Sequence, residues 1–111
     1  MPEKIIEITK NILKENFKTR RLRLNKLILF GSYAGKSFTK ESDVDLIIVS
    51  SDFRNKSLSK RVKIMLGLNR ELVRHLKKPV DTFYYSDEEW NKEESLIINE
   101  AKKKGIVLID K

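Results

Sequence analysis

The chain has 111 residues and no cysteine, and its formal net charge is +8, with 36% charged and 40% hydrophobic residues. A chain without cysteine excludes disulfides and thiolate metal sites and is typical of a reducing cytoplasm, where we expect this protein to act. No apolar run approaches the roughly 20 residues that span a bilayer, and the first ten residues lack the pattern of a secretory signal, so we expect no membrane partner. The length predicts one domain over residues 1–111.

The positive charge favours an anionic partner, either a nucleoside triphosphate or an acidic protein. It would also permit binding to nucleic-acid phosphates. However, the lysines and arginines are spread over most of the chain, without the interleaved aromatic residues of RNA-binding sheets, so nucleic acid is the less favoured partner. Self-association stays open.

The first predicted element is a helix that begins at Pro2 and ends near Arg21. Proline suits the first turn of a helix, and cations near the end complement the helix dipole. Apolar residues recur at helical spacing and predict the face that packs on a sheet: Ile5, Ile8, Ile12, Leu13 and Phe17.

A short apolar run, Leu27–Phe30, predicts a buried strand that ends at Gly31-Ser32. A glycine after a strand lets the backbone turn sharply and lets a ligand approach closely. Ser32 is a suitable N-cap for a short helix over residues 33–36. Free amides at such a helix start bind anions, so we expect an anion site at Gly31 and Ser32.

Asp43 and Asp45 follow the glycine-serine turn after ten residues and lead directly into a second apolar run, Leu46–Val49. Residues two apart in a strand point to the same face, so the two carboxylates are expected to project side by side. Like charges raise each other's pKa unless a cation neutralises them, and hard oxygen ligands suit Mg²⁺ or Mn²⁺. The alternative is a solvated turn followed by an ordinary strand-edge charge.

The rest of the chain predicts two long helices and two strands. Apolar residues at helical spacing predict a helix over about 58–76: Leu58, Val62, Met65, Leu66, Leu72, Val73 and Leu76. Lys77, Lys78 and Pro79 end it. The segment Val80–Tyr85 predicts a strand with Asp81, Phe83 and Tyr85 on one face.

Ser86, followed three residues on by Glu89, predicts a capping box and a helix from about Asp87 to Lys104. Gly105 is expected at its C-cap, before a last strand over residues 106–109. Trp90 and the apolar positions of this helix are candidate contacts for a partner, although a core role for Trp90 is an equal alternative.

Gly31-Ser32, ten residues and then Asp43-x-Asp45 resemble the signature of the polymerase-β-like nucleotidyltransferase superfamily. The whole chain is similar to the minimal nucleotidyltransferases, which usually act as antitoxins paired with an HEPN-domain toxin. Asp81 stands where the family keeps its third carboxylate. One departure is visible: the family often has Arg then Gly after Gly-Ser-x-Ala, whereas Gly35 precedes Lys36 here, which shifts the basic residue by one position.

The resemblance implies an α/β (α+β) architecture with a small mixed β-sheet flanked by helices, the nucleotidyltransferase or polymerase-β palm-like fold. It implies strands at about 24–30, 44–50, 80–85 and 106–109. It also implies a cytoplasmic, metal-dependent nucleotidyltransferase that moves AMP from ATP to a hydroxyl, with pyrophosphate as the leaving group. The implied acceptor is a partner HEPN toxin, which would make the chain the antitoxin of a toxin–antitoxin pair.

The same resemblance assigns the site residues. Asp43, Asp45 and Asp81 would be catalytic and would hold Mg²⁺, or alternatively Mn²⁺. Gly31, Ser32 and Lys36 would bind the phosphates of ATP.

Two other functions stay open. An antibiotic-type transferase for small molecules usually carries an added acceptor-binding domain, for which 111 residues leave no room. A non-catalytic module could neutralise a partner by contact alone. The three carboxylates do not suggest such a loss of chemistry, but the shifted Lys36 keeps it open.

Overall fold

The computed structural model describes residues 2–34 and 43–111. It contains one sheet with the strand order β3-β2-β1-β4. The strands are β1 (Lys26–Phe30), β2 (Val44–Val49), β3 (Val80–Tyr85) and β4 (Ile106–Asp110). β1 runs antiparallel to β2 and β4, and β2 runs parallel to β3, so the predicted mixed sheet is confirmed.

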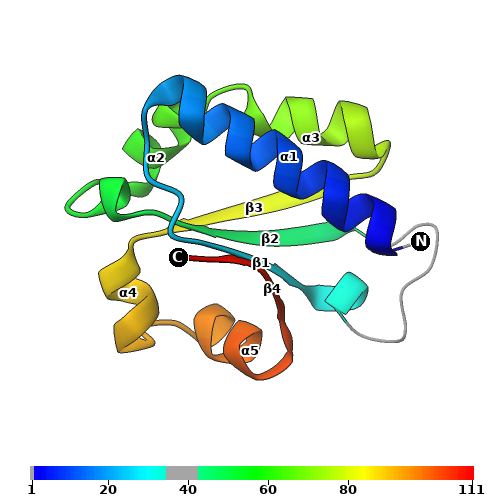
Figure 1. Cartoon of the computed structure of the whole chain (residues 1–111). Helices are drawn as coiled ribbons and strands as arrows, with labels where there is room; N and C mark the ends of the chain where they lie inside the picture. Colours follow the sequence, from blue (N-terminus) through cyan, green and yellow to red (C-terminus); the bar gives the residue numbers. More distant parts are fainter. Residues whose placement is uncertain (1, 35–42) are drawn as a thin grey trace.

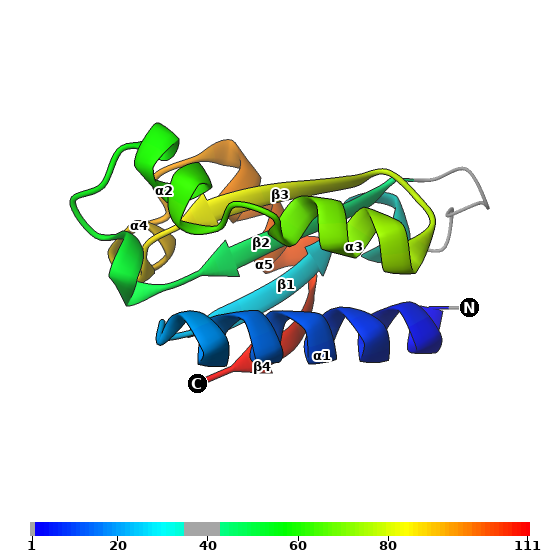
Figure 2. The same ribbon diagram turned by 90° about the horizontal axis from the view of Figure 1, so that it is seen from above.

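Helices cover both faces of this sheet (Figure 1). α1 (Pro2–Arg20) and α3 (Leu68–Leu76) lie side by side over one face, with α2 (Leu58–Ile64) on the same side (Figure 2). α4 (Asp87–Lys92) and α5 (Leu96–Lys104) cover the other face. Among helices within the described ranges, none combines the length and hydrophobicity needed to cross a bilayer.

The alternation of side chains along the strands divides the core into two clusters. Along β1, Leu27 and Leu29 pack under α1, whereas Ile28 packs under α5. The larger cluster includes Leu13, Phe17, Leu27, Leu29, Leu46, Ile48, Leu68, Leu72 and Tyr84. The smaller one consists of Ile28, Ile47, Val49, Trp90, Ile98 and Ala101. Trp90 is 6% exposed, so its core role is confirmed and the partner-contact interpretation is wrong.

The prediction of one continuous helix over 58–76 is wrong. The chain leaves α2 after Ile64 and starts α3 at Leu68, because Gly67 takes a left-handed backbone conformation with φ of +92°. The apolar stripe is therefore split. Leu68 and Leu72 enter the core, whereas the apolar residues around α2 remain open to solvent: Leu58 is 66% exposed, Val62 47% and Leu66 73%.

The predicted helix over 87–104 is also divided. The capping box of Ser86 and Glu89 is confirmed, but α4 ends at Lys92 and Glu93 adopts φ of 55°. Ser95 then caps α5 by accepting a hydrogen bond from the Ile98 amide at 3.1 Å. Apolar spacing continues across this break, so it does not reveal the new helix start. Gly105 is the C-cap of α5, as predicted.

Buried Arg61 joins three elements. Its Nη1 atom donates to the Tyr84 carbonyl of β3 at 2.9 Å and to Oε1 of Glu89 on α4 at 2.7 Å. Its Nε atom donates to the Lys56 carbonyl at 3.0 Å. Burial alone would raise the pKa of Glu89, but hydrogen bonds from Arg61 and Ser86 outweigh burial and hold that pKa below its usual range.

We predict that Arg61→Met lowers the free energy of unfolding by about 2–3 kcal/mol, because it leaves the Tyr84 carbonyl and the Glu89 carboxylate without their donor. Lys60→Met changes an exposed neighbour on the same helix and should cost less than about 0.5 kcal/mol. Urea unfolding of both variants measures the difference, and equal losses would contradict a stabilising role for the Arg61 network.

Candidate functional site

Two of the predicted acids meet at one end of the sheet. Asp45 of β2 and Asp81 of β3 are register partners across the parallel pair, and their carboxyl groups share a hydrogen bond. Both occupy the strand face that also presents Ile47 and Phe83. The register therefore places two acids from distant parts of the sequence side by side.

The surroundings of Asp45 raise the pKa of its carboxyl group. Burial, followed by the charge and hydrogen bond of Asp81 and the charge of Asp43, raises the pKa of Asp45 to about 6. Asp43 itself is exposed and lies directly before β2. The other two predicted acids, Asp43 and Asp81, thus both raise the pKa of Asp45.

Gly31 brings the backbone against this carboxylate. The short 3₁₀ helix η1 (Gly31–Ala34) follows β1, and Gly31 takes φ of +75°. A Cβ atom added to Gly31 would lie 2.1 Å from Oδ2 of Asp45 and 3.1 Å from its Cγ. Only glycine leaves that space, so the turn after β1 and the acid of β2 form one local unit.

The other predicted phosphate contacts are placed only in part. η1 begins at Gly31, so Ser32 is its second residue and not its N-cap, which corrects the predicted cap position. The turn starts one residue early because Gly31 adopts a conformation that other residues avoid. Lys36 lies outside the described residues, as does the second half of the predicted helix over 33–36.

An aromatic pair adjoins the acids and was not singled out from the sequence. Phe30 is the register partner of Asp45, and Phe83 lies two residues beyond Asp81 on the same face. The two rings meet edge to face with centroids 5.5 Å apart. Strand alternation already placed Phe83 beside Asp81, and this was the available signal. The aromatic contact therefore lies on the same face of the sheet as the two acids.

The donor chemistry of the acid pair suits a divalent cation. Across residues 2–34 and 43–111, no three acid, histidine or cysteine side chains are arranged around one point as metal ligands. Nevertheless, Asp45 and Asp81 adjoin, and Asp43 acts on Asp45 electrostatically. Carboxylate oxygens are the ligands that Mg²⁺ and Mn²⁺ prefer, and a cation would relieve the repulsion between these groups. The three metal ligands stay a prediction.

Comparison with known proteins connects this arrangement to a family. The sequence model described as "Nucleotidyltransferase domain" matches residues 6–108. Two curated proteins of Methanocaldococcus jannaschii, each named "Putative protein adenylyltransferase", are 49% identical over 47 residues and 39% identical over 61 residues. The matches cover 42% and 54% of this chain, and 44% and 62% of the relatives. The chain thus spans less than two thirds of the length of these relatives.

Solved structures show the same fold. A chain from a toxin–antitoxin crystal structure with AMP-PNP has a TM-score of 0.65 at 19% identity, and the match covers 91% of this chain and 73% of that chain. A chain from the complex of tri-AMPylated Shewanella oneidensis HEPN toxin with its MNT antitoxin has a TM-score of 0.58 at 18% identity, covering 96% and 73%. These likenesses confirm the predicted fold class.

We predict that Gly31→Ala lowers the free energy of unfolding by at least about 1 kcal/mol more than Gly67→Ala. Both glycines have positive φ, and an alanine there costs about 1–2 kcal/mol in backbone conformation alone. The space differs, because the nearest atom to an added Cβ at Gly67 is Nη2 of Arg20 at 4.0 Å, whereas Asp45 blocks the position at Gly31. Urea unfolding measures both. Equal losses of unfolding free energy would show that the Asp45 side chain does not clash with a Cβ atom at position 31.

We predict that Asp45→Asn stabilises the protein near pH 7.5 in EDTA. The folded-state pKa of about 6 lies above the ordinary 3.8, so the contribution of Asp45 to stability falls as the pH rises from about 4 to 6. The full shift would correspond to about 3 kcal/mol, which solvent screening of this half-buried group reduces to about 1 kcal/mol, or about 4 °C in Tm.

The amide of the variant can still donate to Asp81, so the gain should disappear at pH 4, where the wild-type carboxyl is also neutral. Asp110→Asn, which removes only the surface ion pair with Lys26 at the exposed end of β4, serves as the control and should not stabilise the protein at pH 7.5. Thermal unfolding at the two pH values gives the result, and destabilisation by Asp45→Asn at pH 7.5 would count against repulsion in the empty site.

Proposed function

This chain belongs to the nucleotidyltransferase domain family, and on that premise we propose that it transfers AMP from ATP to a hydroxyl group of a partner protein. The observation that carries the proposal is the Asp45–Asp81 pair set against the Gly31 turn. The names of the Methanocaldococcus jannaschii relatives favour a protein acceptor. The AMP-PNP in the toxin–antitoxin structure favours an adenine nucleotide.

In this proposal the acceptor oxygen forms a bond to the α-phosphorus of ATP while the bond from that phosphorus to pyrophosphate breaks. The turn at Gly31 and Ser32 binds the triphosphate, and Lys36 adds positive charge beside it. The Asp45–Asp81 pair takes up the proton of the hydroxyl as the general base of the reaction.

Asp43, Asp45 and Asp81 are also the residues that would hold a divalent cation. Mg²⁺ at these carboxylates would neutralise charge on the phosphates and polarise the reacting oxygens. The adjoining position of Asp45 and Asp81 supports a shared ion, and the electrostatic influence of Asp43 on Asp45 supports Asp43 as a third oxygen donor.

We further infer that the acceptor is an HEPN toxin and that the chain acts as its antitoxin. The fold neighbour in complex with a tri-AMPylated HEPN toxin supports this partner class. A small acceptor would need a binding module of its own, whereas a protein acceptor brings its own docking surface. The net charge of +8 favours encounter with an acidic protein.

The test uses the full chain, ATP, Mg²⁺ and an HEPN protein encoded beside it, with intact mass as the readout. We predict that the partner gains the mass of AMP, that EDTA abolishes the gain, and that Asp45→Asn lowers the rate at least about 100-fold by removing a group from the reacting centre. Asp110→Asn is the control and should retain the rate.

Two outcomes would contradict AMP transfer to a protein and would each establish a different function. Neutralisation of the toxin that survives Asp45→Asn, with no added mass on the partner, would establish a binding module. Transfer of AMP to an aminoglycoside but to no protein would establish a small-molecule transferase.

A further inference from the structure

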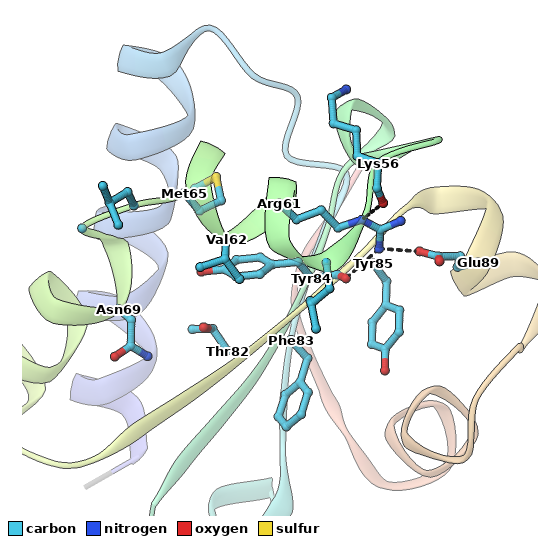
Figure 3. A pocket seen from close by; sticks show the side chains of 13 residues that line it. Lys56, Arg61, Val62, Met65, Asn69, Thr82, Phe83, Tyr84, Tyr85 and Glu89 are labelled. Carbon is cyan, nitrogen blue, oxygen red and sulfur yellow. Dashed lines mark hydrogen bonds and ion pairs between the residues drawn. The ribbon is translucent and has the colours of Figure 1, made fainter.

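A groove of about 630 Å³ lies between α2 and β3, and none of the three predicted catalytic acids lines it. β3 is an edge strand of the sheet, so one side of its backbone faces this groove. Figure 3 shows Val62 and Met65 of the α2 segment on one side and Thr82 and Tyr84 of β3 on the other. The volume falls in the range of ligand-binding clefts.

Side chains occupy two of the outward carbonyls on the free edge of β3. The carbonyl of Tyr85 accepts from the Ser50 amide on the β2 side, so the even-numbered residues of β3 point their main-chain groups outward. The carbonyl of Val80 accepts from Nδ2 of Asn69 at 2.7 Å, and that of Tyr84 accepts from Nη1 of Arg61 at 2.9 Å.

Thr82 lies between these two caps. Its main-chain N–H and C=O face the groove, and within the described part of the chain they have no hydrogen-bond partner. One residue therefore offers a donor and an acceptor in the geometry that pairs with one residue of another chain. The caps occupy the outward carbonyls on either side, so Thr82 is the residue of this edge, within the described chain, at which both main-chain groups are open.

The helical side of the groove is apolar and exposed. Leu58, Val62 and Leu66 recur at intervals of four residues and form one stripe, and two of them are more than 60% exposed. In the part of the chain that the structure describes, no element covers this stripe. A contiguous apolar surface of this kind marks a contact site for another molecule.

The charge around the groove is positive. Glu89 is the one acid among its lining residues, and Arg61 neutralises it. Lys56 then remains as the lining residue whose charge no acid of the groove neutralises, and α2 itself carries no acid. The surroundings therefore favour an occupant with carboxylates beside its apolar part.

We propose that this groove binds a short acidic–apolar peptide segment of a partner protein. One residue of the segment pairs its main-chain N–H and C=O with Thr82, and its bulky side chain fills the space between Val62 and Tyr84. Acidic neighbours of that residue face Lys56. The proposal concerns binding alone and does not require that any transfer takes place.

The test selects nine-residue peptides from a random displayed library on the full chain and measures the Kd of the enriched peptides by fluorescence anisotropy. We expect a bulky apolar residue flanked by acids, a shift of the Thr82 amide signal in ¹⁵N-correlated NMR spectra, and at least a 10-fold loss of affinity in Val62→Asp. Leu96→Asp, at an 83% exposed leucine of α5, is the matched control and should leave the Kd unchanged.

Because Val62 is 47% exposed, its variant should fold, and Leu66→Asp at a 73% exposed position provides an independent second variant. Peptides that bind both variants as well as the wild type, a consensus without acids, or a library without enriched peptides would overturn the proposal. Self-association in sedimentation that Val62→Asp abolishes would assign the groove to a second copy instead. The AMP-transfer assay does not enter these readouts, so either proposal can fail separately.

Discussion

The parallel register of β2 and β3 is the constraint on which the candidate site depends. It sets Asp45 beside Asp81 on one face, so that two carboxylates from strands far apart in sequence repel each other at short range. The left-handed turn at Gly31 then closes the space above Asp45. A shift of register by one residue would send one acid to the opposite face and leave no pair.

The two faces of the sheet have different roles. The face under α1 and α3 is filled by aliphatic and aromatic side chains, and it supplies the larger core. The face under α5 has a smaller core, and it carries the acid pair and the Phe30–Phe83 contact at one end. Arg61 links the first side to α4 on the other, so the edge beside β3 is held in place from both sides.

Strand positions and faces could be predicted from the sequence because alternation within Val80–Tyr85 and the apolar runs near residues 27 and 46 directly encode them. The interruptions of the helices could not, since apolar spacing continues through Gly67 and Ser95 while local backbone conformation and capping end each helix. Because the break at Gly67 was not predicted, the exposure of Leu58, Val62 and Leu66 could not be predicted either. The pairing of Asp45 with Asp81 could be expected only from the family resemblance, because register between distant strands leaves no local signal.

The side-chain caps on β3 also determine where the sheet stops. An uncapped edge of six residues could pair with the same edge of another molecule and so join two sheets into one. Asn69 and Arg61 occupy the two carbonyls that such pairing would need on either side of Thr82. With both of these carbonyls occupied, two such edges cannot form the full set of main-chain hydrogen bonds that would hold two sheets together, so side chains protect this edge against sheet pairing.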